Sequence, residues 1–227
     1  PAETAPSPVP APTKPMPAED PGRPPAASFE ADEPPRTLYS AGRLDEAEAQ
    51  AQDLIDDERF AQAAGLLDDV VEGASAQWGR HSDRLADLRL QRAFALGLSG
   101  DIRRALPEFD ALAAHFAAAD GPDSERALEC RHQAALCRAH LGESTTALRE
   151  LQDVVGRMAV TGGQRDPAAL DVRMEIGRLL VFTGRIAEAG PHLDALHPDL
   201  KAEYGAGDLM TREAADMLDR IRRAGSG

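Results

Sequence analysis

A spacing of 42 residues recurs along the chain and constrains its fold more than any other feature of the sequence. Gly100, Gly142 and Gly184 follow one another at this interval, and the same step back from Gly100 reaches Glu58. Relative to these four positions, alanine lies five residues later, a small residue seven earlier and a large apolar residue nine later. The aligned residues are Ala63, Ala105, Ala147 and Ala189; Ala51, Ala93, Ala135 and Gly177; and Leu67, Phe109, Leu151 and Leu193. One gap-free alignment therefore covers four repeats, and such a period is typical of tandem helical units.

The offsets predict a helix hairpin in each repeat. A small residue and the alanine twelve positions later let two helix backbones approach closely, and the large residue fills the seam one turn on. The turn glycine ends the first helix in a left-handed conformation. A second glycine series starts each connector, and an N-cap Ser or Asp follows three residues later. These positions are Gly79, Gly121, Gly163 and Gly205, with Ser82, Ser124, Asp166 and Asp208.

We therefore expect an all-α fold of four hairpins followed by a C-terminal capping helix with a charged outer face. The predicted helices are 42–56, 59–73, 82–98, 101–119, 123–141, 143–160, 166–182, 185–200 and 208–224. The repeat domain spans 38–227, with repeats at about 42–79, 80–121, 122–163 and 164–205.

Residues 1–37 differ in composition from everything that follows. They hold 12 of the 17 prolines, which remove helix hydrogen bonds, and they carry too little apolar surface to form a core. We predict a disordered Pro/Ala-rich linker. The alternative is a proline-rich ligand for a groove-type domain, but no basic residue lies cleanly beside a PxxP core. Because the chain begins with Pro rather than Met, we expect a piece of a longer protein or a processed product.

Charge and cysteine content narrow the choice of partners and location. The net charge is −14, which repels phosphate backbones and anionic lipid, so we expect neither nucleic acid nor a membrane as partner. No apolar run approaches the roughly 18 residues of a membrane helix, and no signal peptide is recognisable. Cys130 and Cys137 lie two turns apart on one predicted helix, about 10 Å along its axis, which is too far for a disulfide. Reduced thiols and a cytoplasmic location are the expectation.

The pattern small–x11–Ala–x3–large resembles the tetratricopeptide repeat (TPR). The 42-residue period resembles the longer variant found in kinesin light chains, whose connectors begin with an aromatic residue and glycine. Trp78-Gly79 and Tyr204-Gly205 match those two positions, whereas the proline expected later in the connector is absent from most copies. The resemblance covers 42–227 and implies a right-handed TPR α-solenoid that binds other proteins.

A narrower resemblance concerns residues 88–152, which are similar to the C-terminal repeat regions of actinobacterial Ser/Thr protein kinases. In those proteins a Pro/Ala-rich linker joins the kinase domain to the repeats, and 1–37 fits that linker. The chain has no Gly-rich loop with a Lys-bearing strand, no HRD and no DFG. The resemblance therefore implies the non-catalytic part of a signalling kinase.

In TPR solenoids the first helix of each hairpin lines a concave groove. The family's inward positions fall here on Asp87, Leu90, Phe94 and Leu98; Glu129, His132, Leu136 and His140; and Asp171, Met174, Arg178 and Phe182. None is Lys or Asn, so the carboxylate clamp of chaperone-binding members is absent. The predicted peptide-binding residues are Leu90, Phe94, Leu98, His132, Leu136, His140, Met174, Arg178 and Phe182. The alternative is that half of these side chains pack between adjacent hairpins.

No constellation for chemistry is evident. Cys130, His132, Cys137 and His140 lie close in sequence, but no CxxC or HxxxH spacing occurs, and helical cysteines are commonly core residues. There is no GxSxG, and Gly162-Gly163 is not followed by GK[ST]. We predict no catalytic, metal or cofactor site. The expected function is a peptide-binding scaffold or regulatory module, with homodimerisation or a free-standing adaptor as alternatives.

Overall fold

The computed structural model describes residues 41–79, 82–161, 163 and 165–224. This part of the chain is helical throughout and contains no strand. The elements are α1 (Ala41–Asp56), α2 (Phe60–Trp78), α3 (Asp83–Leu98), α4 (Ile102–Asp120), α5 (Glu125–His140), α6 (Ser144–Thr161), α7 (Pro167–Phe182), α8 (Ile186–Tyr204) and α9 (Leu209–Ala224).

The predicted helix boundaries agree with these within two residues, except at two C-termini. α2 continues to Trp78 rather than ending at 73, and α8 continues to Tyr204 rather than ending at 200. Each of these helices runs on to the connector glycine, where a positive φ ends it. The linker predicted at 1–37 lies outside the described residues.

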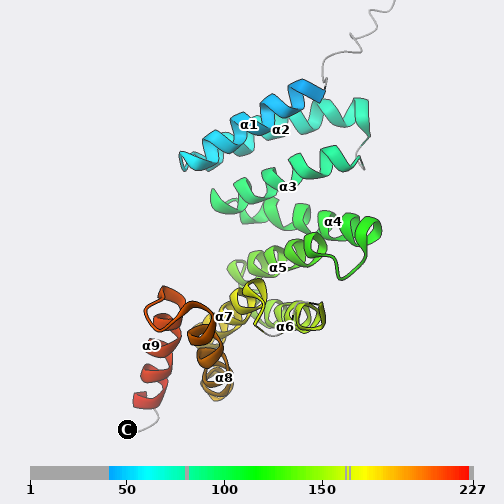
Figure 1. Ribbon diagram of the computed structural model, residues 1–227. Coiled ribbons are helices and arrows are strands. Elements are labelled where there is room, and N and C mark those ends of the chain that lie inside the picture. Colours follow the sequence, from blue (N-terminus) through cyan, green and yellow to red (C-terminus); the bar gives the residue numbers. More distant parts are fainter. Residues whose placement is uncertain (1–40, 80–81, 162, 164, 225–227) are drawn as a thin grey trace, which may run out of the picture. The chain divides into compact units, whose positions relative to one another are not determined.

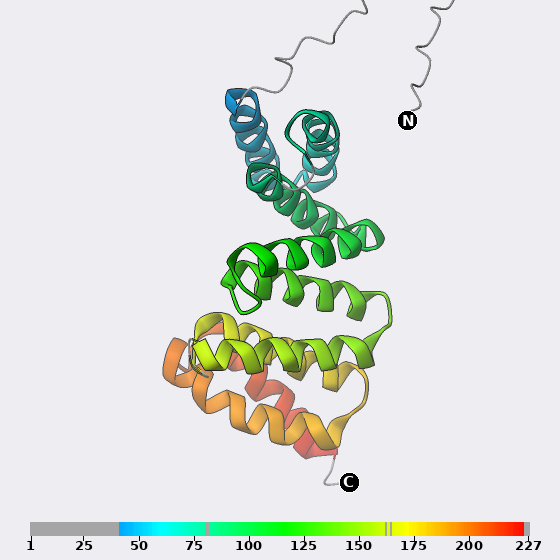
Figure 2. The same cartoon turned by 90° about the vertical axis from the view of Figure 1, so that its right-hand side faces the viewer.

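Consecutive helices pack against each other in an antiparallel stack (Figures 1 and 2). We call α1, α3, α5, α7 and α9 the A helices, and α2, α4, α6 and α8 the B helices. The inner A helices α3, α5 and α7 each contact the B helix on either side, whereas α1 contacts α2 and α9 contacts α8. The pairs α1–α3 and α7–α9 also contact each other directly. Because the A helices share one side of the stack, equivalent positions 42 residues apart form rows along it.

The turn between A and B helices requires a left-handed residue in all four hairpins. Gly100, Gly142 and Gly184 have φ values of 85°, 87° and 72°. The first hairpin has Glu58 at this position, with φ 58°, and it is the only non-glycine residue with positive φ in the described part of the chain. The repeat therefore imposes the same backbone geometry even where the sequence lacks the glycine that suits it.

The predicted N-caps begin the A helices. Ser82 Oγ accepts a hydrogen bond from the Leu85 amide at 3.2 Å, and Ser124 Oγ accepts one from Ala127 at 3.4 Å. The Asp166 carboxylate accepts from the Ala168 amide at 3.0 Å. These bonds satisfy amides that have no partner within the helix, so each A helix starts at a fixed residue.

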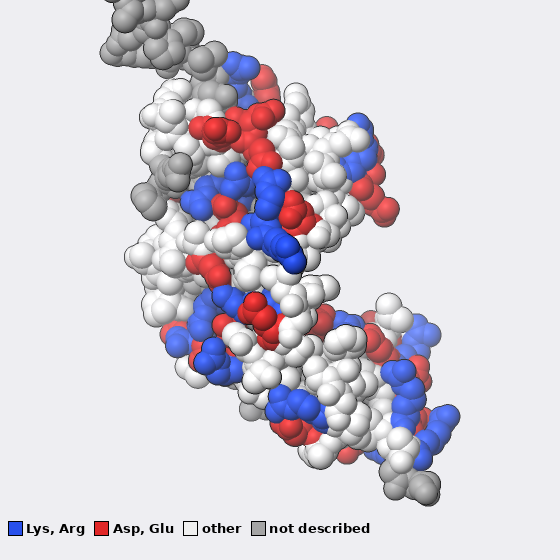
Figure 3. Space-filling view, turned by 180° about the vertical axis from the view of Figure 1, so that it is seen from behind, with Lys and Arg blue, Asp and Glu red and all other residues white. Residues whose placement is uncertain are grey.

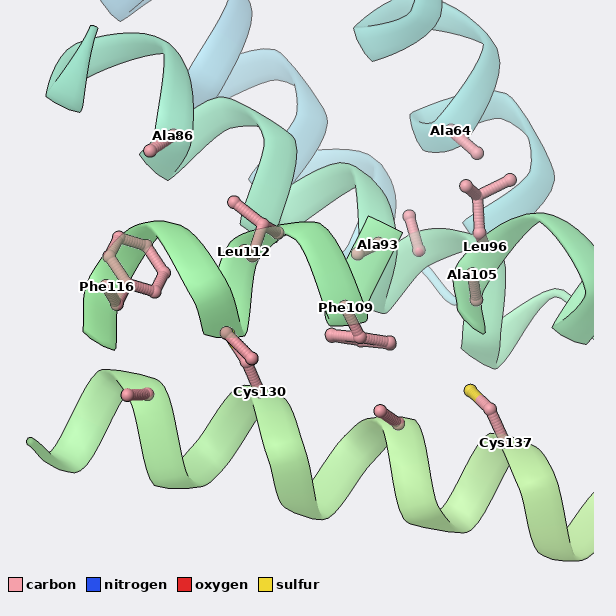
Figure 4. Close-up of a cluster of buried hydrophobic side chains, with 14 of the residues drawn as sticks. Ala64, Ala86, Ala93, Leu96, Ala105, Phe109, Leu112, Phe116, Cys130 and Cys137 are labelled. Atoms are coloured by element: carbon pink, nitrogen blue, oxygen red, sulfur yellow. The ribbon is translucent and has the colours of Figure 1, made fainter. Parts of the chain in front are cut away.

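The core is the alanine and leucine seam that the repeat predicts. Ala93 and Ala105 are fully buried where α3 meets α4, and Phe109 fills the space beside them (Figure 4). The fourth hairpin has glycine at the small position, and a Cβ added to Gly177 would lie 2.7 Å from Leu193 Cδ2. Close packing of small against large side chains therefore holds the hairpins together.

Both cysteines belong to this core. Cys130 and Cys137 are free thiols that point from α5 toward α4 (Figure 4). Burial raises the pKa of Cys130 to about 12 and that of Cys137 to about 11. They are therefore packed, protonated side chains.

The capping helix α9 differs from the other A helices at one position of the repeat. Forty-two residues after Gly177, where a following B helix would pack closely, the chain has Asp219. Asp219 is exposed and lies 3.9 Å from both Arg222 and Arg223. The opposite face is buried through Thr211, Ala214, Met217 and Leu218. α9 therefore packs on one side and presents charge on the other.

Candidate functional site

Four of the nine predicted groove residues line one pocket between α5 and α7. The pocket has a volume of about 390 Å³, and Leu136, His140, Arg178 and Phe182 form part of its wall. The remaining lining residues are Ala139, Leu151, Glu175 and Leu179. Residues from both A helices and from α6 beneath them therefore enclose a single cavity.

The floor and rim of the pocket are apolar. Leu136 is half-buried against the core, and Leu179 is only 8% exposed. Phe182 is 82% exposed at the end of α7, so its ring leaves most of its apolar surface in water. His140 Nδ1 donates to the Leu136 carbonyl at 2.8 Å, which fixes the ring at the end of α5. The cavity can accept an apolar side chain, which would cover surface that water now contacts.

Arg178 supplies the charged wall and joins α7 to α9. Its Nε donates to Glu213 Oε1 at 2.9 Å and its Nη2 donates to Glu213 Oε2 at 2.6 Å, while Nη1 donates to Glu175 at 2.6 Å. The hydrogen bonds between Arg178 and Glu213 raise the pKa of Arg178 and lower the pKa of Glu213. Arg178 is therefore already engaged with two carboxylates.

Three predicted groove residues pack within the helix stack or lie at its edge. Leu90 and Phe94 are half-buried against the core of the second hairpin. The Phe94 ring meets the Phe109 ring edge-on, at 5.3 Å between centroids and 76° between planes. Leu98 is 57% exposed at the end of α3. None of the three lines the α5–α7 pocket.

The prediction is wrong for Met174. Its side chain has no exposed surface and packs in a cluster with Leu170, Leu193 and Ala214. The reason is that α7 contacts α9 directly, so this part of the A-helix side is covered. A fully buried side chain cannot contact a peptide.

His132 is also nearly enclosed, with 8% of its surface exposed. Its Nδ1 lies 3.7 Å from the Glu129 carboxylate, and its Nε2 has no hydrogen-bond partner among the described residues. The nearby His132 side chain lowers the pKa of Glu129. His132 can therefore orient this carboxylate but offers little surface of its own.

The repeat also places an acidic row on the A helices. The sequence reasoning named three of its members among the inward positions but did not extend the row to Asp45 and Glu213. Each A helix carries a carboxylate at the same position, and simple extension of the 42-residue alignment would have found the series. The residues of this acidic row are Asp45, Asp87, Glu129, Asp171 and Glu213.

Arginine neutralises the first two carboxylates of the acidic row, in each case from 39 residues further along the chain. Arg84 forms an ion pair with Asp45 and a second one, at 2.7 Å, with Glu48. Arg126 Nη1 lies 3.4 Å from Asp87. At the end of the row, Glu213 is neutralised by Arg178 as described above.

The two middle carboxylates lack an arginine at that spacing. The positions 39 residues beyond Glu129 and Asp171 hold Ala168 and Met210. Glu129 accepts a hydrogen bond from Gln133 Nε2 at 2.9 Å. Asp171 has no hydrogen bond or ion pair within the described part of the chain, and burial raises its pKa. The acidic row thus lacks an arginine partner on α5 and α7, the two A helices that form the apolar pocket.

A larger polar pocket, of about 720 Å³, lies between α2, α3 and α4. Arg92 Nη2 donates to Glu108 at 2.7 Å, and Arg104 Nη2 donates to Asp68 at 2.6 Å. Figure 3 shows acidic and basic side chains interspersed over the face that it displays. Mutual pairing leaves this pocket without a dominant sign of charge to select a ligand.

Among residues 41–79, 82–161, 163 and 165–224, no three His, Cys, Asp or Glu side chains are arranged to hold a metal ion. No described helix is long and apolar enough to cross a membrane.

No family model matches the chain, and no curated protein matches it. Solved structures do. A structure described as kinesin light chain nearly identical TPR-like repeats, from Podosopora anserina, has a TM-score of 0.69 at 18% identity, over 83% of this chain and 90% of that one. BtubC (BKLC) from P. vanneervenii gives a TM-score of 0.57 at 15% identity, over 82% of each chain. A Rap protein complexed with Competence and Sporulation Factor gives 0.56 at 13% identity, over 81% of this chain and 55% of that one. The fold is therefore an all-α, TPR-like solenoid of four helix hairpins with a C-terminal capping helix.

Proposed function

We propose that this chain is a protein- or peptide-binding module and that its ligand site is the α5–α7 pocket. The observation that carries this proposal is the pocket itself, where Leu136 and Phe182, far apart in sequence, line the same cavity. The exposure of the Phe182 ring adds to it, because an aromatic side chain left 82% exposed gains from being covered by a partner. The Rap structure, with its bound factor, is an example of a similar fold that holds a ligand.

The proposal does not extend to catalysis. The described residues offer a cavity with apolar walls and an arginine already paired with two carboxylates, which suits binding and orientation. The role we infer is that of a scaffold or regulatory module in a larger signalling protein. The resemblance of residues 88–152 to kinase-linked repeats supports the non-catalytic C-terminal region of a bacterial Ser/Thr protein kinase as the parent.

Selection of peptides tests the site. The 227-residue chain is immobilised and exposed to a phage-displayed library of random peptides, and the recovered peptides are then measured against two variants. Phe182→Asp places a charge at the pocket, whereas Val160→Asp places the same charge at an equally exposed apolar residue of α6, outside the pocket lining. We expect Phe182→Asp to abolish binding and Val160→Asp to retain it. Equal binding by both variants would refute the assignment of the pocket.

Homodimerisation is the second candidate. Leu209 is 72% exposed and Tyr204 is 36% exposed on either side of the α8–α9 connector, so a second copy could cover this end of the stack. Light scattering across a range of concentrations tests it. A constant monomer mass up to high concentration would exclude a dimer, whereas a mass that rises toward twice the monomer and is lowered by Leu209→Asp would support one.

A further inference from the structure

Acidic side chains outnumber arginines at the α5–α7 pocket and along the helices that form it. Glu175 and Arg178 line the pocket, Glu213 of α9 pairs with Arg178, and Glu129 and Asp171 lie further along α5 and α7. Arg178 is the one arginine that forms an ion pair with any of these four carboxylates in the described structure. The whole chain carries a net charge of −14, so the remaining surface does not offset this excess. A ligand that enters the pocket therefore meets a negative potential.

The negative charge without an arginine partner is concentrated on Glu129 and Asp171. These are the two carboxylates of the acidic row without an arginine partner, because Ala168 and Met210 replace the residues equivalent to Arg84 and Arg126. Burial is the main cause of the raised pKa of Asp171, and the nearby charge of Glu129 raises that pKa further. An arginine 39 residues further along the chain thus neutralises the first two carboxylates of the row, and no arginine occupies that position for the carboxylates of α5 and α7.

His132 lies close to Glu129 and Asp171. More than nine-tenths of its surface is buried, it faces the Glu129 carboxylate at 3.7 Å, and its charge also acts on Asp171. Its Nε2 has no hydrogen-bond partner in the described residues. The Glu129 side chain is 38% exposed and Asp171 is exposed, so both carboxylates can be reached by an incoming cation.

The carboxylates and the pocket lie at a defined separation. Leu136 and Arg178 follow Glu129 and Asp171 by seven residues on their helices, which corresponds to about 10 Å along the axis. An extended peptide advances about 3.3 Å per residue, so about three residues span this distance. One extended segment can therefore reach both places at once.

We propose that the module recognises a basic peptide, with an apolar side chain in the α5–α7 pocket and an arginine or lysine about three residues away against Glu129 and Asp171. This inference rests on the proposed function, because it names the ligand class of the same pocket. A cation at that point supplies to the two middle carboxylates the partner that Arg84 and Arg126 supply to Asp45 and Asp87.

The repeat provides the decisive variant. Ala168 is exposed, and Ala168→Arg places an arginine 39 residues beyond Glu129, the spacing at which Arg126 pairs with Asp87. This change fills the cation position without altering the apolar wall. Asp171→Asn removes the second carboxylate with little change of volume. Asp69→Asn, on the exposed side of α2, serves as the matched control because it changes the net charge by the same single unit in the same direction.

The library selection described above is sequenced, and recovered peptides are synthesised for fluorescence anisotropy with the full chain. We expect arginine or lysine enriched about three residues from a Leu, Met or Phe. Ala168→Arg and Asp171→Asn should each weaken binding about twofold to fivefold, the range expected for an ion pair near the surface, and Asp69→Asn should leave it unchanged. Raising NaCl to about 0.5 M should reduce the difference in affinity between the unchanged protein and these two variants, because salt shortens the distance over which charges interact.

The outcomes separate this inference from the function on which it rests. Peptides that depend on Phe182 but show no basic enrichment would overturn the basic-peptide proposal and leave the pocket intact. Basic peptides whose affinity is unchanged by both Ala168→Arg and Asp171→Asn would overturn the assignment to Glu129 and Asp171. Recovery of no peptide at all would overturn the peptide-binding function itself.

Discussion

Arg178 of α7 holds Glu213 of α9 through two parallel hydrogen bonds, at 2.9 and 2.6 Å. The pair joins the last hairpin to the capping helix and lies at the wall of the α5–α7 pocket. A forked guanidinium–carboxylate contact fixes orientation as well as distance, so Arg178 contributes to the position of α9 relative to α7.

Arg178→Leu should loosen α9. About a third of each partner's side chain is exposed, so solvent screening limits the loss of unfolding free energy to about 1 kcal/mol. The pKa of Glu213 is lowered from 4.5, so the stabilisation is present above that pH and disappears as the pH falls through the lower folded value. Urea denaturation at successively lower pH and hydrogen exchange of the α9 amides measure both effects. Arg103→Leu is the control, and equal loss in the two variants at every pH would contradict a specific role.

Glu58→Gly should stabilise the protein. Glu58 adopts φ 58° at the turn where the three later hairpins have glycine, and a left-handed conformation costs a non-glycine residue about 1 kcal/mol. The reciprocal change Gly100→Glu should destabilise it by a similar amount, since Gly100 has φ 85° and space is open around its Cα. Opposite shifts of the urea midpoint are expected. A midpoint that falls in both variants would show that the Glu58 side chain outweighs its backbone strain.

Two phenylalanines should respond very differently to truncation. Phe109 is 1% exposed in the seam between α3, α4 and α5, so Phe109→Ala should lower the unfolding free energy by about 3–5 kcal/mol. Phe182 is 82% exposed, so Phe182→Ala should change it by about 0.5 kcal/mol or less. Thermal denaturation compares them directly. A large loss from Phe182→Ala would mean that this ring is structural and would weaken its assignment to a ligand site.

Cys130 and Cys137 should resist thiol reagents in the folded protein. Both are buried, and their pKa values of about 12 and 11 leave almost no thiolate near pH 8. Titration with a chromogenic disulfide should show no fast reaction until urea unfolds the chain. Ala76→Cys, at an exposed site on α2, provides the reactive control. Fast reaction of a native cysteine would reveal local opening of α5.

The architecture could be predicted from the sequence because every repeat carries the same local signals in the same register. Gly100, Ala105 and Phe109 are each sufficient to place a turn, a close helix contact and a core side chain, and four copies remove ambiguity. The end of α2 was misplaced because a glycine within a helix does not by itself end it: α2 passes through Gly73, where it was predicted to end, and stops at Gly79, which has a positive φ.

The site could be predicted only in part. The register places Leu136 and Met174 on the same side of their helices, yet Leu136 lines a pocket and Met174 is sealed beneath α9. The exposure of such a side chain depends on how far apart neighbouring A helices lie. The 42-residue repeat length does not specify this distance. The acidic row was visible in the sequence, but which members lack a partner follows from pairs such as Arg126 with Asp87, seen only in the structure.

Each helix packs chiefly on its neighbours in the chain, so the local stability of a helix depends on where it lies in the stack. Helices at the two ends have one neighbouring hairpin, whereas the α5–α7 pocket has two hairpins on its N-terminal side and α8 and α9 on the other. Separation of α1 and α2 therefore leaves the walls of the pocket in place, whereas separation of α9 releases Arg178, which lines it. A ligand held there would be retained through partial unwinding of the N-terminal hairpin, and its departure would report on the C-terminal half of the array.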